Sequence, residues 1–183
     1  ETKTLCCTNP KCQAKHIKSF ALFVSRDAMN IEGLSEATLE KFVMNGFIKD
    51  FTDIFHLDRH EEEIKAMDGF GEKSYLKLQA GVQNARVTTL PRLVYSLGIP
   101  NIGSANAKMI CRALGNDPER VMNATAEELA EISGVGEVIA GTYVQYFADE
   151  EHREIFRRLH NKHHYSTIEG ILRLPGYRRV EKE

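Results

Sequence analysis

The sequence predicts an all-α fold in which pairs of helices repeat along the chain. Apolar residues recur at helical spacing over most of the 183 residues, and no segment of useful length alternates like a strand. One kind of glycine turn also returns four times, which indicates a repeated structural unit. We expect a connecting segment in residues 1–24, a four-unit helical domain in 25–160 and an unassigned tail in 161–183.

Each repeated turn places a hydrophobic residue between two residues that are mostly glycine, and a helical pattern follows. The hydrophobic residue, such as Phe70, can turn inward and hold two helices together, which makes each unit a helix-hairpin-helix. Glycine allows a positive φ or a close approach of another backbone, so a β-branched residue at Gly71 or Gly136 should strain the turn. The turns follow one another at steps of 36, 32 and 33 residues, counted at their third positions Ser35, Gly71, Gly103 and Gly136.

Helices are expected throughout the first half of the chain. Residues 13–24 place Ile17, Phe20, Ala21 and Val24 on one face. The helix after the first turn should stop at Asn45-Gly46, because this pair is a common helix end. Two short helices, 51–57 and 61–67, precede the second turn, and the helix of residues 72–86 follows it.

The second half continues the pattern with clear helix signals. A helix in 90–98 should end at Gly98, and Asp117 is a cap that precedes a proline at the first helical position. Thr125 and Glu128 have the spacing of a capping box, and Leu129 and Ile132 should face inward before the fourth turn. The helix of residues 136–147 and an amphipathic segment with Ile155, Phe156 and Leu159 complete the domain. Beyond about residue 160 the sequence fits neither a hairpin nor a helix.

The helix that follows each turn is a candidate phosphate site. The first amides of a helix have no partner inside it, and the helix dipole is positive there. Contacts of this kind read no bases, so binding to duplex DNA should not depend on sequence. The residues expected at the DNA backbone are Arg26, Gly33, Leu34, Gly69, Phe70, Gly71, Lys73, Ser74, Gly103, Ser104, Lys108, Gly134, Val135 and Gly136.

Charge argues in part against this interpretation. The net charge is −2, whereas nucleic-acid-binding chains are usually basic. Glu36, Glu72 and Glu137 each follow a turn directly, and an acid there satisfies the dipole and repels phosphate unless it points aside. For any single turn, helix packing without a ligand is therefore an equal alternative. We favour DNA at the second and fourth turns, which keep both glycines.

Cys7 and Cys12 are separated by a short Asn-Pro turn and could both bind one zinc ion. A structural zinc site needs four ligands, and no second cysteine pair follows. The pair is therefore either half of a four-cysteine zinc knuckle, completed by residues upstream, or part of a tail with free thiols. No apolar run is long enough to cross a membrane and no secretory signal is visible, so we expect a bacterial cytoplasmic protein.

Several motifs resemble bacterial NAD-dependent DNA ligase over residues 7 to about 160. The most specific is Ser25-Arg26-Asp27-Ala28-Met29-Asn30-Ile31-Glu32-Gly33-Leu34, and the cysteine segment and the second and fourth turns also match. The resemblance implies the end of a zinc finger and a four-unit helix-hairpin-helix domain that grips nicked DNA. The sequence differs from the family pattern at three places. Ser35 replaces the glycine that closes the first turn, Asn101 replaces the glycine that opens the third, and the first cysteine pair is missing. Those two turns are expected to bind phosphate less well or to serve in packing.

The resemblance also implies chemistry that this chain does not carry. The family's adenylated lysine lies in a Lys-x-Asp-Gly motif, and Lys65-Ala66-Met67-Asp68-Gly69 has one residue too many. NAD and Mg²⁺ would therefore act in the remaining ligase domains, and this chain would bind DNA without catalysing a reaction. The alternatives are a non-catalytic module of another repair factor, a helix-hairpin-helix DNA glycosylase and a helical protein-interaction repeat. Four evenly spaced turns argue against the glycosylase.

Overall fold

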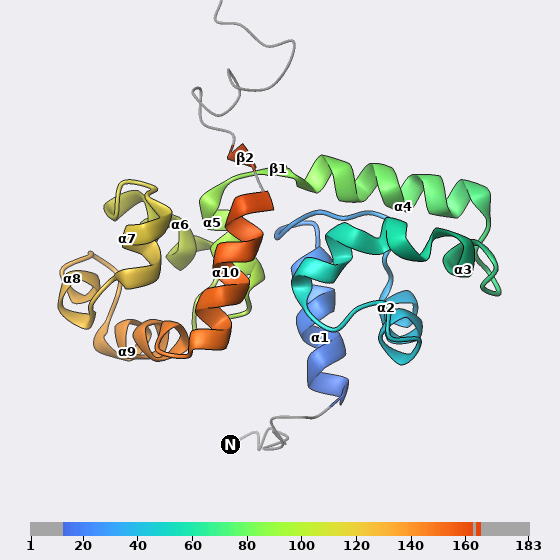
Figure 1. The fold of residues 1–183 in the computed structure, drawn as a ribbon. Helices are drawn as coiled ribbons and strands as arrows, with labels where there is room; N and C mark the ends of the chain where they lie inside the picture. The colour runs from blue at the N-terminus through green and yellow to red at the C-terminus, as the bar shows by residue number, and fades with distance from the viewer. Residues whose placement is uncertain (1–12, 163, 166–183) are drawn as a thin grey trace, which may run out of the picture.

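The computed structural model describes residues 13–162 and 164–165 and confirms a mostly helical fold (Figure 1). Almost all of the regular structure in this part of the chain is helical. The elements are α1 (Gln13–Val24), α2 (Glu36–Met44), the 3₁₀ helix η1 (Phe51–His60), α3 (Glu61–Lys65), α4 (Glu72–Ala85), β1 (Val87–Thr88), α5 (Leu90–Ser96), α6 (Ser104–Ala113), α7 (Pro118–Asn123), α8 (Ala126–Ala130), α9 (Glu137–Phe147), α10 (Glu150–Lys162) and β2 (His164–Tyr165).

The helices gather into two groups. Helices α1 to α4 with η1 form one group and α6 to α9 form the other, and α5 and α10 lie between them (Figure 1). Each repeated turn lies between two helices that pack on each other: α1 with α2, α3 with α4, α5 with α6, and α8 with α9. Each turn thus connects two helices that are in contact.

A single apolar core runs through both groups. The inward face predicted for α1 is confirmed, because Ile17, Phe20 and Val24 are buried and Ala21 packs beside them. Phe23 is also fully buried and stacks on Phe51 of η1, with ring centroids 4.6 Å apart. Such aromatic pairs add to the free energy gained from burying apolar area.

Helix α10 joins the two groups. It packs on α9 and on η1, and its Phe156 and Leu159 are buried in the core. Arg158 Nη1 lies 3.2 Å from Asp50 Oδ2, and Asp50 also accepts a hydrogen bond from the backbone N–H of Thr52 at 2.7 Å. One carboxylate thus caps η1 and holds α10 against it.

The helix ends follow the sequence signals. Asp117 accepts hydrogen bonds from the backbone N–H groups of Glu119 and Arg120, and the capping box of Thr125 and Glu128 forms. Asn45 is the last capping residue of α2, and both Gly46 and Gly98 have positive φ values. These caps are local interactions between residues a few positions apart, so they are visible in the sequence.

The regular structure differs in two details from the sequence expectation. Residues 87–88 and 164–165 form a short parallel strand pair in an otherwise helical part of the chain. The element at 51–60 is one 3₁₀ helix with a break at His56, longer than the expected 51–57 segment. The strand pair joins positions more than 70 residues apart, which no local pattern predicts.

Two further expectations concern a zinc site and a membrane span. Cys7 and Cys12, the predicted zinc ligands, lie outside them, so the half zinc knuckle stays a prediction. Within residues 13–162 and 164–165, no helix combines the length and the apolar character needed to span a bilayer.

Replacing Asp50 with alanine should lower the free energy of unfolding by about 2 kcal/mol, because η1 loses its cap and Arg158 loses its partner. Burial raises the pKa of Asp50, whereas the hydrogen bonds from Thr52 and the charge of Arg158 lower it. The lowering effects outweigh burial, so the pKa lies below its ordinary value of 3.8. The stabilisation is therefore present above this pH and is lost as the pH falls through the pKa of the folded state.

Urea denaturation at pH 7 and at pH 3 tests this prediction. The difference in stability between the two proteins should be smaller at pH 3 than at pH 7. Asp58→Ala provides the control, because this carboxylate is exposed on the same helix. An Asp50→Ala protein as stable as the wild type at pH 7 would contradict the assigned role.

Candidate nucleic-acid interface

The four repeated turns share one backbone conformation at their first residue. Each first residue lies in the left-handed region, with φ of +94° at Gly33, +80° at Gly69, +64° at Asn101 and +89° at Gly134. Glycine adopts this region without strain, and asparagine is among the side chains that tolerate it best. The predicted departure at Asn101 therefore leaves the shape of the third turn intact.

The middle residue of each turn packs inward. Leu34, Ile102 and Val135 are buried, and Phe70 is half-buried with its ring centroid 5.8 Å from that of Phe42. The backbone N–H of Phe70 donates to the carbonyl of Met67, and that of Val135 donates to Ile132. The middle residues therefore shape the turns, and the amides of Phe70, Ile102 and Val135 already donate to backbone carbonyls.

The third residue of each turn is the cap of the next helix and has an extended backbone. Gly71, Gly103 and Gly136 provide no side-chain hydrogen bond to the helix that follows. A Cβ atom at any of the three would meet nothing within 4 Å. The expectation that a β-branched residue would strain Gly71 or Gly136 is wrong, because neither glycine has a positive φ or a close neighbour.

These glycines instead leave the helix starts open. Among the contacts between described residues, no acceptor occupies the backbone N–H groups of residues 72–74, 104–106 and 137–139. Such amides are available to an outside acceptor, and the helix dipole favours an anion there. This geometry narrows the candidate donors to the starts of α4, α6 and α9.

The first turn differs because Ser35 replaces the glycine. Its Oγ accepts a hydrogen bond from the backbone N–H of Thr38 at 3.1 Å and lies 2.9 Å from Thr38 Oγ1. A phosphate oxygen would have to displace this cap. The substitution therefore gives a physical reason for the expectation that the first turn binds phosphate less well.

The side chains predicted to contact DNA are distributed unevenly. Lys73 and Ser74 are exposed on the first turn of α4. Ser104 and Lys108 are exposed on α6 and line a hollow of about 340 Å³ together with Asp27, Thr89, Pro91, Arg92 and Tyr95. No lysine or arginine lies near the fourth turn in the sequence, since residues 121–152 contain neither.

Arg26 lies on a loop that a second arginine fixes in place. Arg92, on α5, donates to the carbonyl of Ala28 at 2.7 Å and to the carbonyl of Arg26 at 2.6 Å. These bonds hold the loop before the first turn against the helix before the third. The side chain of Arg26 is exposed, and its backbone is positioned by Arg92.

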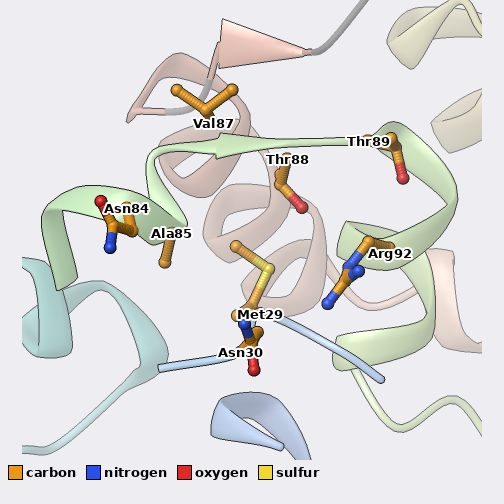
Figure 2. Close-up of a pocket in the computed structure, with 8 residues that line it drawn as sticks. All are labelled: Met29, Asn30, Asn84, Ala85, Val87, Thr88, Thr89 and Arg92. Carbon is orange, nitrogen blue, oxygen red and sulfur yellow. The ribbon is translucent and has the colours of Figure 1, made fainter. Parts of the chain in front are cut away.

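A smaller cavity lies beside this contact (Figure 2). It has a volume of about 200 Å³ and is lined by Met29, Asn30, Asn84, Ala85, Val87, Thr88, Thr89 and Arg92. Thr88 points toward Met29, whereas Val87 lies on the opposite side of the strand (Figure 2). Pockets for small organic ligands are usually larger than about 300 Å³. We therefore read this cavity as a packing gap between the loop after α1, the end of α4 and the start of α5.

Comparison with known proteins agrees with this geometry. A family model described as "Helix-hairpin-helix motif" matches residues 92–156, which include the third and fourth turns. The chain is 53% identical over 159 residues to a DNA ligase of Lachnoclostridium phytofermentans, covering 87% of this chain and 24% of that protein. The resemblance to bacterial DNA ligase is confirmed.

Two further ligases support the same conclusion. The DNA ligase of Ruminiclostridium cellulolyticum is 49% identical over 160 residues, covering 87% of this chain and 24% of the ligase. The DNA ligase of Petrotoga mobilis is 36% identical over 154 residues, covering 84% of this chain and 23% of the ligase. The chain thus spans about a quarter of the length of the curated ligases that it matches.

Sequence reasoning missed Arg92 and Gly81, which fix how the turns sit relative to one another. Gly81 lies inside α4, and a Cβ there would come within 2.8 Å of the carbonyl oxygen of Glu32, just before the first turn. The first turn itself approaches α4, since a Cβ on Gly33 would lie 3.3 Å from Leu78 Cα. A glycine within a helical pattern was the one available signal, because it suggests a close backbone approach.

Replacing Gly81 with alanine should lower the free energy of unfolding by about 1–3 kcal/mol, because the new methyl group overlaps the backbone of Glu32. Gly141→Ala is the matched control, since Gly141 lies inside α9 with nothing within 4 Å of its Cβ position. The free energy of unfolding of that variant should rise by up to about 1 kcal/mol, because alanine has a higher helix propensity than glycine. Thermal unfolding of both proteins measures the difference, and equal stabilisation would contradict the close approach.

Proposed function

We propose that this chain is the DNA-binding part of an NAD-dependent DNA ligase and holds nicked duplex DNA while the remaining ligase domains seal the nick. The observation that carries the proposal is the set of open helix starts at Gly71, Gly103 and Gly136 in a chain that resembles DNA ligases. Such starts suit an acceptor with negative charge, which the phosphate backbone supplies. Replication, repair and recombination are the processes that use this activity.

The proposed contacts need no base recognition. Amides at the starts of α4, α6 and α9 would donate to phosphate oxygens on either side of the minor groove, and Lys73 and Lys108 would add positive charge. Phosphate contacts fix the position of a protein on a duplex without reading its sequence. We therefore propose sequence-independent binding by four helix-hairpin-helix units in tandem, with the first turn weakened by the Ser35 cap.

The other parts of the reaction would lie elsewhere in the ligase. We propose that Cys7 and Cys12 supply half of a four-cysteine zinc site whose other ligands precede residue 1. NAD and Mg²⁺ would act in the remaining domains, in the bacterial cytoplasm. The pKa of Lys65 is raised by hydrogen bonds to Glu61 and Glu72, which keeps its amine protonated and unsuited to nucleophilic attack.

A protein-interaction role is the second candidate, and one observation favours it. The fourth turn lies in a stretch, residues 121–152, with seven acidic residues and no lysine or arginine. Such a surface repels phosphate at long range and suits a basic protein partner. Under this alternative the chain would bind duplex DNA weakly or not at all at low salt.

Fluorescence anisotropy with a nicked duplex and the same duplex sealed decides between the two. We expect binding to both duplexes, a preference for the nick, and an affinity that falls as salt rises because phosphate contacts release counterions. Several duplexes of unrelated sequence should bind equally. A flat salt response, or no binding at low salt, would contradict a DNA clamp and favour the protein-interaction role.

Alanine at Gly71, Gly103 or Gly136 should weaken DNA binding by roughly three- to tenfold while leaving the fold intact, because the new Cβ would occupy the space in front of the open amides. None of the three positions requires glycine for its backbone or its packing. Gly141→Ala serves as the control outside the turns. Unchanged affinity in all three variants, with normal melting temperatures, would show that the helix starts do not contact DNA.

A further inference from the structure

Three of the four turns place a glutamate at the first position of the helix that follows. Glu36, Glu72 and Glu137 begin α2, α4 and α9, whereas α6 begins with Ser104. A carboxylate at this position interacts favourably with the helix dipole. It also opposes the approach of a phosphate to the same amides, since like charges a few ångströms apart repel.

In the second turn, an ion pair reduces the repulsion between the glutamate and a phosphate. Lys65 is the last residue of α3, before the turn, and its Nζ lies 2.9 Å from Oε2 of Glu72, the first residue of α4 after the turn. The ion pair therefore spans the turn from one helix to the other. It holds the Glu72 carboxylate toward α3 and offsets part of its charge, because Lys65 also pairs with Glu61.

Lys65 is itself held in a defined position. Its ammonium also pairs with Glu61 and lies 5.1 Å from the ring centroid of Tyr75, a buried residue of α4. The Lys65 side chain is 20% exposed, compared with 63% for Glu72. A largely covered lysine in this arrangement is poorly placed to contact DNA directly.

The other two glutamates lack this arrangement. Within the part of the chain that the structure describes, neither Glu36 nor Glu137 has an ion-pair partner within 4.0 Å. Exposed Lys73 lies beside Glu72 in sequence, whereas Val138 takes the same place after Glu137 and is 73% exposed. The four turns thus share a backbone but differ in the charge that a phosphate would meet.

We propose that Lys65 is a positioning residue that makes the second turn a phosphate site, by holding the Glu72 carboxylate aside and offsetting part of its charge. The proposal rests on the proposed function, because it concerns how the same turns bind DNA. Lys65 would affect the affinity for DNA indirectly, by positioning Glu72, and would not itself contact DNA. The proposal also makes Glu137 the uncompensated counterpart of Glu72 at the fourth turn.

A double-mutant cycle tests this assignment in the whole chain. Lys65→Met keeps the apolar stem and should weaken binding to a nicked duplex by roughly three- to tenfold, because Glu72 then repels the phosphate. Glu72→Gln alone should leave the affinity equal or slightly higher. The double variant should recover most of the affinity lost in Lys65→Met, because the carboxylate that Lys65 controls is gone.

Two further variants serve as controls for the charge of the lysine. Lys65→Arg keeps the charge and should bind within about twofold of the wild type. Lys49→Met removes an exposed charge outside the four turns and measures the effect of net charge alone. Glu137→Gln should increase the affinity more than Glu72→Gln does, because Glu137 has no lysine to compensate it.

The outcomes separate failure of this inference from failure of the proposed function. If the wild type binds and the double variant is as weak as Lys65→Met, then Lys65 contacts DNA directly and the inference is overturned. A Lys65→Met protein that binds like the wild type, with a normal melting temperature, overturns it as well. Absence of binding by the wild type at low salt contradicts the proposed function itself.

Discussion

The left-handed residue at the start of each turn determines where the following side chain and helix lie. This conformation reverses the chain in three residues, so that the middle side chain enters the core and the third residue becomes the cap of the next helix. Gly33, Gly69 and Gly134 adopt it without a Cβ, and Asn101 shows that one tolerant side chain suffices. The amides at the next helix start lack a side-chain cap where the third residue is glycine, whereas Ser35 caps the helix after the first turn.

The first and third positions of each turn have different tasks, which the sequence alone does not separate. The first position has a positive φ, which favours glycine or asparagine, whereas the third has an extended backbone that any residue could adopt. Ser35 demonstrates this, since it occupies the third position and caps its helix with its own hydroxyl group. Glycine at the other three turns therefore leaves space outside the protein, which is where an interaction partner would lie.

Local signals in the sequence predicted the helices, their caps and their inward faces, because residues three or four positions apart determine them. The capping box at Thr125 and the apolar face of α1 are examples. Contacts between distant segments were not predictable in this way. Arg92 reaches the carbonyl of Arg26 across 66 positions, and β1 pairs with β2, so both depend on how the two helix groups pack. The predicted DNA contacts at the turns stay predictions.

A duplex presents phosphates at fixed spacing, so turns that bind it together must themselves be held at fixed spacing. Three contacts in this chain hold segments around the turns at fixed distances. Gly81 lets α4 approach the backbone before the first turn, Arg92 ties that same loop to α5, and Arg158 ties α10 to the cap of η1. Each contact joins segments that lie far apart in the sequence. The relative placement of the turns thus depends on a few long-range polar and backbone contacts, whereas the shape of each turn is local, and substitutions at the two kinds of position should affect binding by different routes.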